Sequence, residues 1–235
     1  MLTLQMTRPR AASERFVARI APDLRRRLHV IHSPLIRIVF LPDPVSSGDA
    51  RGVIFTSANG VAAAQAAGLR PALPAYCVGA ATAGAARDAG WTVEMICDTA
   101  DALVAALIDR RPDAPLLHLR GRHARGDVAD RLTAAGVETR AQEVYDQQLI
   151  DPSEAARVAL DGADPVIAPL FSPRTARHFA DTCAGRAPLF LAAISRAAAE
   201  PLENMVYRGL IVARRPDGAA MVTAVETLAA QATSG

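Results

Sequence analysis

Residues 52–68 read GVIFTSANGVAAAQAAG, and this stretch decides the fold. It opens with a short apolar run rich in strand-forming residues, passes through small and polar residues that cap helices, and ends as an alanine-rich helix stopped by glycine. The same plan recurs along the chain, with strands predicted over residues 2–6, 52–56, 75–78, 115–119, 165–171 and 189–194. Each strand is followed by a predicted helix, over residues 13–20, 61–67, 83–89, 127–135, 175–183 and 197–204.

Apolar strands that alternate with helices predict parallel sheets covered on both faces. Two extended stretches break the alternation, residues 29–41, where Pro34 and Pro42 prevent a helix, and residues 137–150. We interpret them as paired linkers through which the chain leaves one domain and later returns. The predicted fold is therefore α/β, with two parallel-sheet domains joined by a two-stranded linker. The first domain is expected to comprise residues 1–35 and 148–235, and the inserted second domain residues 36–147.

The composition excludes several classes of protein. The 235 residues are 51% hydrophobic and 21% charged, which is ordinary for a globular protein. All 26 basic residues are arginine, so neither a Schiff-base lysine nor a GK[ST] phosphate loop is available. A net charge of +2 and a single basic run, Arg25–Arg27, do not indicate a nucleic-acid partner.

Cysteine use and hydropathy bear on the location of the protein. The three cysteines, Cys77, Cys97 and Cys183, lack the spacing of a metal site, and their odd number argues against a disulfide framework. Reduced thiols are typical of the cytoplasm, which is the predicted location. No apolar run reaches the roughly 20 residues that a membrane span needs, and residues 1–10 lack the apolar core of a signal peptide. We therefore expect no membrane association and no metal.

The turns that follow the predicted strands are small or hydroxylated, and each precedes a helix. Ligands of open parallel sheets bind beyond the carboxyl ends of the strands, where helix N-termini offer free N–H groups and partial positive charge. Two domains that face each other would present several such termini to a ligand with many anionic groups. The simpler alternative is that these residues are ordinary helix caps. The turns are Thr7-Arg8, Thr56–Asn59, Gly79–Thr82, Arg120-Gly121, Ser172-Pro173 and Ser195.

Other catalytic motifs are scarce. The histidines lack the HExxH spacing, residues 79–84 lack the GxGxxG spacing of a dinucleotide site, and no serine lies in a GxSxG turn. Tyr145 ends an extended stretch beside Asp146, where its phenol could serve as a proton donor. The alternative, a linker tyrosine with a packed ring, remains open at this point.

The chain resembles the uroporphyrinogen-III synthase family along most of its length. Each matching segment is short, but their order and spacing together are specific. The segments are residues 7–9 (TRP), 34–38 (PLIRI), 53–61 (VIFTSANGV), 76–83 (YCVGAATA) followed by 90–91 (GW), 116–121 (LLHLRG), 144–146 (VYD), 171–173 (FSP) and 193–195 (AIS).

The resemblance implies two α/β domains and a defined reaction. The implied enzyme is a lyase of haem biosynthesis that closes hydroxymethylbilane, an octacarboxylate tetrapyrrole, to uroporphyrinogen III, with loss of water and inversion of the terminal pyrrole ring. It implies no cofactor and no metal, binding through main-chain amides in an interdomain cleft, and a monomer. Carried over residue by residue, Tyr145 is the candidate general acid. The implied substrate-binding residues are Thr7, Arg8, Ser57, Ala58, Asn59, Ala81, Thr82, Arg120, Gly121, Ser172, Pro173 and Ser195.

The chain departs from the family pattern in two places. Ala198 stands where the family usually has threonine, and the stretch at residues 42–50 is short. These departures motivate an alternative from another class, a catalytically inactive, ligand-binding or regulatory paralogue with the same bilobed fold. A binding protein of periplasmic type is a weaker option, because residues 1–10 do not read as a secretion signal.

Overall fold

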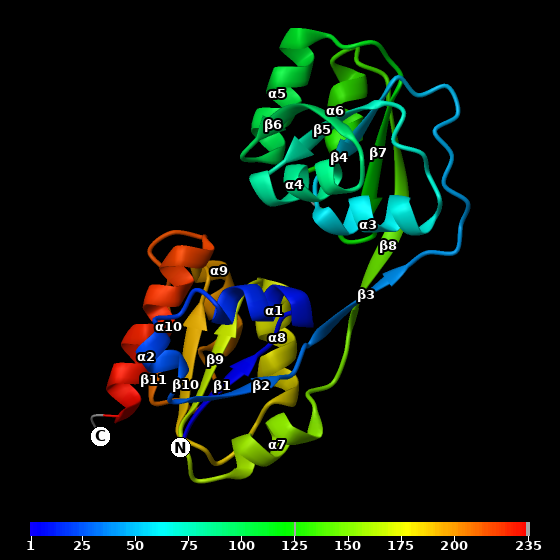
Figure 1. Cartoon of the computed structure of the whole chain (residues 1–235). Helices are drawn as coiled ribbons and strands as arrows, with labels where there is room; N and C mark the ends of the chain where they lie inside the picture. The colour runs from blue at the N-terminus through cyan, green and yellow to red at the C-terminus, as the bar shows by residue number, and fades with distance from the viewer. Residues whose placement is uncertain (125, 234–235) are drawn as a thin grey trace. The chain divides into compact units, whose positions relative to one another are not determined.

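The computed structural model describes residues 1–124 and 126–233, which form two compact units (Figure 1). Met1–Arg37 and Gln148–Gly235 make up unit 1, and Ile38–Gln147 make up unit 2. The chain passes between the units twice, within strand β3 (Ile36–Phe40) and within strand β8 (Thr139–Leu149).

The two crossing strands are neighbours. The N–H of Leu41 donates to the carbonyl of Val144 over 3.0 Å, and the N–H of Ile150 donates to the carbonyl of Leu35 over 3.1 Å. The two strands therefore run in opposite directions, so the pair is antiparallel. The remaining strand pairs that carry the candidate site residues are parallel.

Unit 1 is built on a five-stranded sheet in the order β11-β10-β9-β1-β2. Its neighbouring strands are parallel, and every residue of β1, β9 and β10 is buried. This explains why their sequences are nearly continuous apolar runs. The strands are β1 (Leu2–Met6), β2 (Leu28–His32), β9 (Val166–Leu170), β10 (Leu189–Ala193) and β11 (Gly209–Val212).

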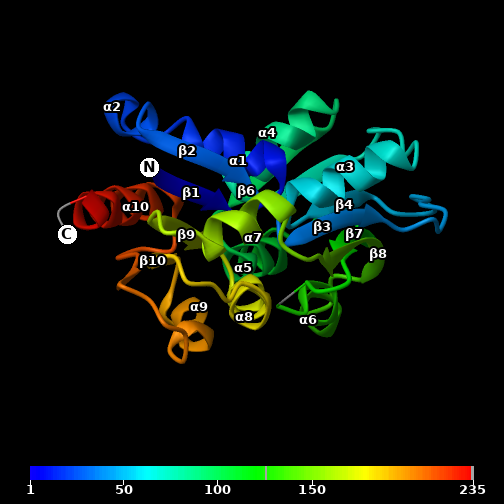
Figure 2. The ribbon, with the colours of Figure 1, turned by 90° about the horizontal axis from the view of Figure 1, so that it is seen from below.

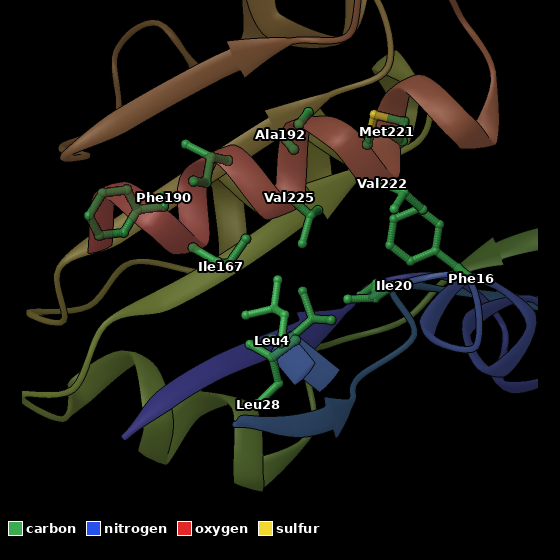
Figure 3. Close-up of a cluster of buried hydrophobic side chains, with 14 of the residues drawn as sticks. Leu4, Phe16, Ile20, Leu28, Ile167, Phe190, Ala192, Met221, Val222 and Val225 are labelled. Carbon is green, nitrogen blue, oxygen red and sulfur yellow. The ribbon is translucent and has the colours of Figure 1, made fainter. Parts of the chain in front are cut away.

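Helices cover both faces of this sheet (Figure 2). On one face α1, α2 and α10 bury a cluster that includes Leu4, Phe16 and Val225 (Figure 3). On the other face α7, α8 and α9 bury Phe179 and Leu191. The helices are α1 (Arg10–Val17), α2 (Pro22–Arg25), α7 (Glu154–Asp161), α8 (Pro173–Thr182), α9 (Arg196–Ala199) with a 3₁₀ turn (Glu200–Leu202), and α10 (Gly218–Thr233).

Unit 2 is built on a six-stranded sheet in the order β3-β8-β7-β4-β5-β6, parallel from β8 to β6. One face packs Phe55 edge-to-face on Trp91, with ring centroids 5.1 Å apart, beneath α3 and α4. The other face packs Ile54 and Leu116 beneath α5 and α6. The remaining elements are β4 (Gly52–Phe55), β5 (Pro74–Val78), β6 (Thr92–Cys97), β7 (Leu116–Gly121), α3 (Ala58–Ala66), α4 (Ala80–Asp88), α5 (Ala100–Arg110) and α6 (Val128–Ala134).

The structure confirms the α/β class with two mainly parallel sheets flanked by helices, and it corrects several local predictions. Leu28–His32 is not a linker but strand β2, paired residue for residue with β1. Arg120 and Gly121 lie inside β7 and do not form a turn. Helices α3 and α4 begin three residues earlier than predicted, so Ala58 and Ala81 lie in first helical turns.

The helices were also compared with the length and hydropathy that a membrane span needs. Among residues 1–124 and 126–233, no helix is both long enough and apolar enough to cross a membrane.

Candidate active site

Four neighbouring strands of unit 2 bring candidate residues to one edge of the sheet. In the order β8-β7-β4-β5, these strands carry Tyr145, then Gly121, then the turn at Ser57–Asn59, then the turn at Gly79–Thr82. Because the strands are parallel and about 4.8 Å apart, their carboxyl ends lie side by side. The sequence-based prediction that these positions share an edge holds within this unit.

Helix α4 begins at this edge, and no side chain of the described residues caps its N-terminus. Its N-cap residue, Gly79, has no side chain and adopts φ +82° and ψ 144°, a region that residues with a Cβ rarely enter. Within the described part of the chain, the N–H groups of Ala80, Ala81 and Thr82 donate to no acceptor. Three amides therefore stand open at the positive end of a helix, the arrangement that binds carboxylates.

The hydroxylated turns behave differently, because their serines cap the helices that follow. The Oγ of Ser57 accepts the N–H of Asn59, that of Ser172 accepts the N–H of Thr175, and that of Ser195 accepts the N–H of Ala198. Pro173, the first residue of α8, has no N–H to offer. These three serines therefore cap the helices that follow, and each cap leaves fewer amides available than α4 has.

Tyr145 is packed by its ring and unpaired at its hydroxyl. The residue is 5% exposed, and a Cβ placed on Gly121 would lie 2.5 Å from the ring, so only glycine fits there. Within residues 1–124 and 126–233 the hydroxyl makes no hydrogen bond, and it is not among the fully buried polar atoms that lack a partner. The ring is therefore packed, as one of the two interpretations from the sequence expects, and the role of the phenol as a proton donor stays a prediction.

Arg120 lies on the opposite face of the sheet from Tyr145. Its guanidinium pairs with Glu143 at 3.1 Å, and Glu143 also contacts Arg122 at 3.4 Å. Arg120 lines a cavity of about 100 Å³ beneath α6 together with His118. The structure therefore does not place Arg120 with the other candidates of unit 2.

His118 is a buried group that the sequence did not single out. It is 2% exposed, its Nε2 lies 3.2 Å from Thr56 Oγ1, and its Nδ1 is buried without a partner among the described residues. Burial, with a smaller contribution from the positive charge of Arg120, lowers the pKa of His118 to about 4. The imidazole is therefore neutral near pH 7 and acts as a core residue.

Unit 1 gathers the remaining candidates at the carboxyl ends of β1, β9 and β10, which are adjacent strands. Thr7 is fully buried and its hydroxyl donates to the carbonyl of Pro169 over 2.7 Å, which fixes β1 against β9. Its side chain is thus structural. Arg8 is half-buried, with Cζ 4.6 Å from the ring centroid of Phe171.

Ala198, the departure from the family pattern, is fully buried in α9. Its side chain belongs to the core cluster that includes Phe179 and Leu202. The residue at this position therefore contributes to packing and presents no polar group at the edge.

The described residues contain no cluster of three or more histidine, cysteine or carboxylate side chains arranged to hold a metal ion. The cysteines are free, with Cys77 and Cys183 buried and Cys97 half-buried. Burial raises the pKa of Cys77 to about 11, so this thiol is protonated near pH 7 and fills core space.

Residues 19–223 match the family model described as uroporphyrinogen-III synthase HemD. The chain belongs to the uroporphyrinogen-III synthase family. The match covers the whole of unit 2 and all candidate residues except Thr7 and Arg8, which precede it. Membership of this family of cyclising lyases agrees with the resemblance seen in the sequence, and no comparison favours the inactive alternative.

Solved structures support the fold of this family member. Uroporphyrinogen-III synthetase from Helicobacter pylori is 17% identical, covers 97% of this chain and 100% of its own, and superposes with a TM-score of 0.71. A mutant uroporphyrinogen III synthase from Thermus thermophilus is 14% identical, covers 98% and 99%, and has a TM-score of 0.50. No curated protein matches the chain.

Proposed function

We propose that this chain closes hydroxymethylbilane to uroporphyrinogen III, with loss of water and inversion of the terminal pyrrole ring. The observation that carries the proposal is the family match over residues 19–223. The reaction as proposed uses no metal and no organic cofactor. Its demands are the binding of eight carboxylates, the departure of a hydroxyl group, and ring closure at the substituted carbon of the last pyrrole.

Main-chain amides of unit 2 are the proposed carboxylate anchors. Ala80, Ala81 and Thr82 offer three N–H groups at the start of α4, and Ala58 offers one at the start of α3. A hydrogen bond from an amide to a carboxylate is charge-assisted and short, and the helix dipole adds to it. These contacts need no particular side chain, which is why small residues serve at these positions.

Side chains of unit 1 are proposed to bind further carboxylates. Arg8 carries a guanidinium that pairs with no carboxylate among the described residues, whereas Arg120 of unit 2 already pairs with Glu143. The turns at Ser172, Pro173 and Ser195 end the neighbouring strands and are proposed to contribute contacts beside Arg8.

Tyr145 is the proposed general acid for loss of the hydroxyl. The phenol has no partner among the described residues, and the ring lies against Gly121 at the edge that the open amides of α4 share. A fixed ring with an uncommitted hydroxyl can donate a proton to a leaving group without first breaking a hydrogen bond. A well-placed donor of this kind contributes about 10²–10⁴-fold to such a step.

Ring closure is mainly a problem of positioning. The bilane closes unaided to the symmetric isomer, so the protein must favour attack at the substituted carbon of the last ring. Anchored carboxylates restrict the two ends of the substrate to a reactive geometry, a large effect in intramolecular reactions. The proposed division of labour is that amides and Arg8 orient the substrate and Tyr145 starts the reaction.

We further propose that the protein acts as a monomer in the cytoplasm. Three free thiols, two of them buried, support a reducing compartment. Light scattering of the purified chain at micromolar concentration should give the mass of one chain, 24.7 kDa. A mass of twice that value would contradict the monomer.

The direct test of the activity is the isomer formed from hydroxymethylbilane. The purified chain is mixed with freshly generated substrate, the product is oxidised, and the uroporphyrins are separated by chromatography beside a reaction without protein. We expect isomer III in large excess. Isomer I alone, formed at the rate of the reaction without protein, would refute the proposed function.

A further inference from the structure

The side chain of Arg8 lies over the ring of Phe171, which is itself packed against a second aromatic ring, at the carboxyl edge of unit 1. Its Cζ lies 4.6 Å from the ring centroid of Phe171, within the distance at which a cation is attracted to a ring face. Phe171 in turn meets Phe16 edge-to-face, with centroids 5.1 Å apart and an interplanar angle of 83°. Ser13 Oγ donates to the carbonyl of Arg8 over 2.9 Å, so the backbone is fixed as well.

The guanidinium held in this way has no counter-charge within the part of the chain that the structure describes. Arg8 is half-buried, and no carboxylate lies within ion-pair distance of it among residues 1–124 and 126–233. Burial, and next the positive charge of Arg15, lower the pKa of Arg8, although an arginine remains protonated at any physiological pH. Its neighbour Arg10, by contrast, pairs with Glu14 at 2.9 Å on the surface.

A partly desolvated cation without a partner is unfavourable unless a ligand supplies the anion. The ring contact leaves the N–H groups of the guanidinium, none of which donates to a described residue, for a carboxylate, which a guanidinium binds in a bidentate manner. The two rings therefore hold a positive charge at this edge and leave its N–H donors unused.

We propose that Phe171, braced by Phe16, is a positioning residue that holds the Arg8 guanidinium ready for a carboxylate of the substrate. The inference rests on the proposed function for the identity of that carboxylate. Phe171 does not touch the reacting atoms in this account, so its loss affects substrate affinity and leaves the chemical step unchanged.

The test compares two substitutions of Phe171. Phe171→Leu keeps an apolar side chain and removes the ring, while Phe171→Trp keeps a ring face for the cation. We expect Phe171→Leu to raise KM for hydroxymethylbilane by about fivefold with kcat within twofold, and Phe171→Trp to restore the wild-type KM. Arg8→Gln should match Phe171→Leu, and the double variant should be no worse than either alone, because both remove one interaction.

Phe190→Leu is the matched control. Phe190 belongs to the same buried cluster as Phe16 but lies at its other end, near the start of β10 (Figure 3). Phe190→Leu should lower the melting temperature at least as much as Phe171→Leu and leave KM unchanged. An equal rise of KM in both variants would show that loosened packing, and not the stack on Arg8, causes the effect, and would overturn the inference.

A binding measurement separates this inference from the proposed reaction. Uroporphyrin III, a stable octacarboxylate, serves as the probe, and its fluorescence reports the dissociation constant. We expect Phe171→Leu and Arg8→Gln to raise this constant by the same factor, and Phe171→Trp to leave it unchanged, whether or not the chain turns hydroxymethylbilane over. A Phe171→Leu variant that binds as well as wild type while Arg8→Gln binds weakly would overturn the positioning role and leave the reaction untouched.

Discussion

The turn after β5 in unit 2 and the turn after β9 in unit 1 both connect a parallel strand to a helix. They differ in how many N–H groups at the start of that helix remain without an acceptor. Gly79 has no side chain, and α4 keeps the N–H groups of Ala80, Ala81 and Thr82 open. In α8, Ser172 caps one N–H and Pro173 lacks another.

Unit 1 has fewer open amides beside β9, but it carries a formal positive charge there, the guanidinium of Arg8. The helix start with glycine leaves three backbone donors for a ligand, whereas the serine-proline start leaves only that of Arg174 among the described residues and relies on a neighbouring side chain. Two edges built on the same strand-turn-helix plan therefore offer different groups to the anions that we propose they bind.

The largest expected effect is a loss of stability at low pH in unit 2, which contains the buried His118, compared with unit 1. His118 of unit 2 has a pKa of about 4 when folded, below the ordinary value of about 6.5, because burial disfavours its charged form. Its contribution to stability is complete above pH 6.5, declines as pH falls below that value, and is lost near pH 4. The loss amounts to about 3 kcal/mol.

Urea unfolding followed by fluorescence of Trp91, which lies in unit 2, measures this loss at pH 7 and pH 4.5. Between pH 7 and pH 4.5, the free energy of unfolding of a His118→Gln variant should fall by about 2–3 kcal/mol less than that of wild type. His29→Gln, at an exposed position of unit 1, is the control and should keep the wild-type dependence. Equal pH dependence in all three proteins would contradict the assignment.

The next largest effect concerns the proposed acid of unit 2. Tyr145→Phe should lower kcat about 10²-fold and change KM less than threefold, because it removes a proton donor and keeps the ring against Gly121. The melting temperature should not change, since the hydroxyl bonds to no described residue. Tyr207→Phe, the same change in unit 1, should leave kcat at the wild-type value. A Tyr145→Phe enzyme with wild-type kcat would remove Tyr145 from the mechanism.

A smaller effect tests the open amides of α4. Ala80 is the first helical residue, and the extended ψ of 144° at Gly79 is compatible with a following proline. Ala80→Pro deletes one N–H and should raise KM about tenfold, the magnitude of one hydrogen bond to a charged group. Ala80→Ser retains the N–H and should keep the wild-type KM. Equal KM values for the two variants would show that this amide does not bind substrate.

The smallest effect is expected for Arg120. Its guanidinium is already paired with Glu143 at 3.1 Å and lies on the α6 face, away from Tyr145. Arg120→Ala should lower kcat/KM less than about threefold, since a half-exposed pair of this kind contributes at most about 1 kcal/mol. A tenfold loss in a variant with wild-type stability would return Arg120 to the binding site.

The sequence was sufficient to predict the general plan of the fold because most central strands are continuous apolar runs. Apolar runs such as residues 189–193 read as buried parallel strands, and alanine-rich segments between glycines read as helices. Strands β6 and β11 and helices α5, α7 and α10 were not predicted. The sequence of β6, TVEMIC, has alternating exposure at a sheet edge. Helix α10 has a narrow polar face, Thr223, Glu226, Thr227 and Gln231, which is weakly marked because threonine and glutamine are the main polar residues in it.

The candidate site was predictable only as a set of turns. The position of Gly121 beside Tyr145, and the separation of Arg120 onto the other face, depend on the alternation of side chains in β7 and on its irregular pairing with β8 after Arg120. The contact between Arg8 and Phe171 joins residues far apart in the sequence. No local pattern records such a contact, although the FSP segment at residues 171–173 had already marked that turn.

The most direct test of the different means of binding is the salt dependence of KM for hydroxymethylbilane. Measurements between about 50 and 300 mM KCl shorten the Debye length from roughly 14 to 6 Å and weaken contacts to formal charges most. In our account KM rises with salt for wild type and for Ala80→Pro, which retain Arg8, and rises distinctly less for Arg8→Gln. A salt dependence in Arg8→Gln equal to that of wild type would contradict the account, because unit 1 would then bind no carboxylate through its guanidinium.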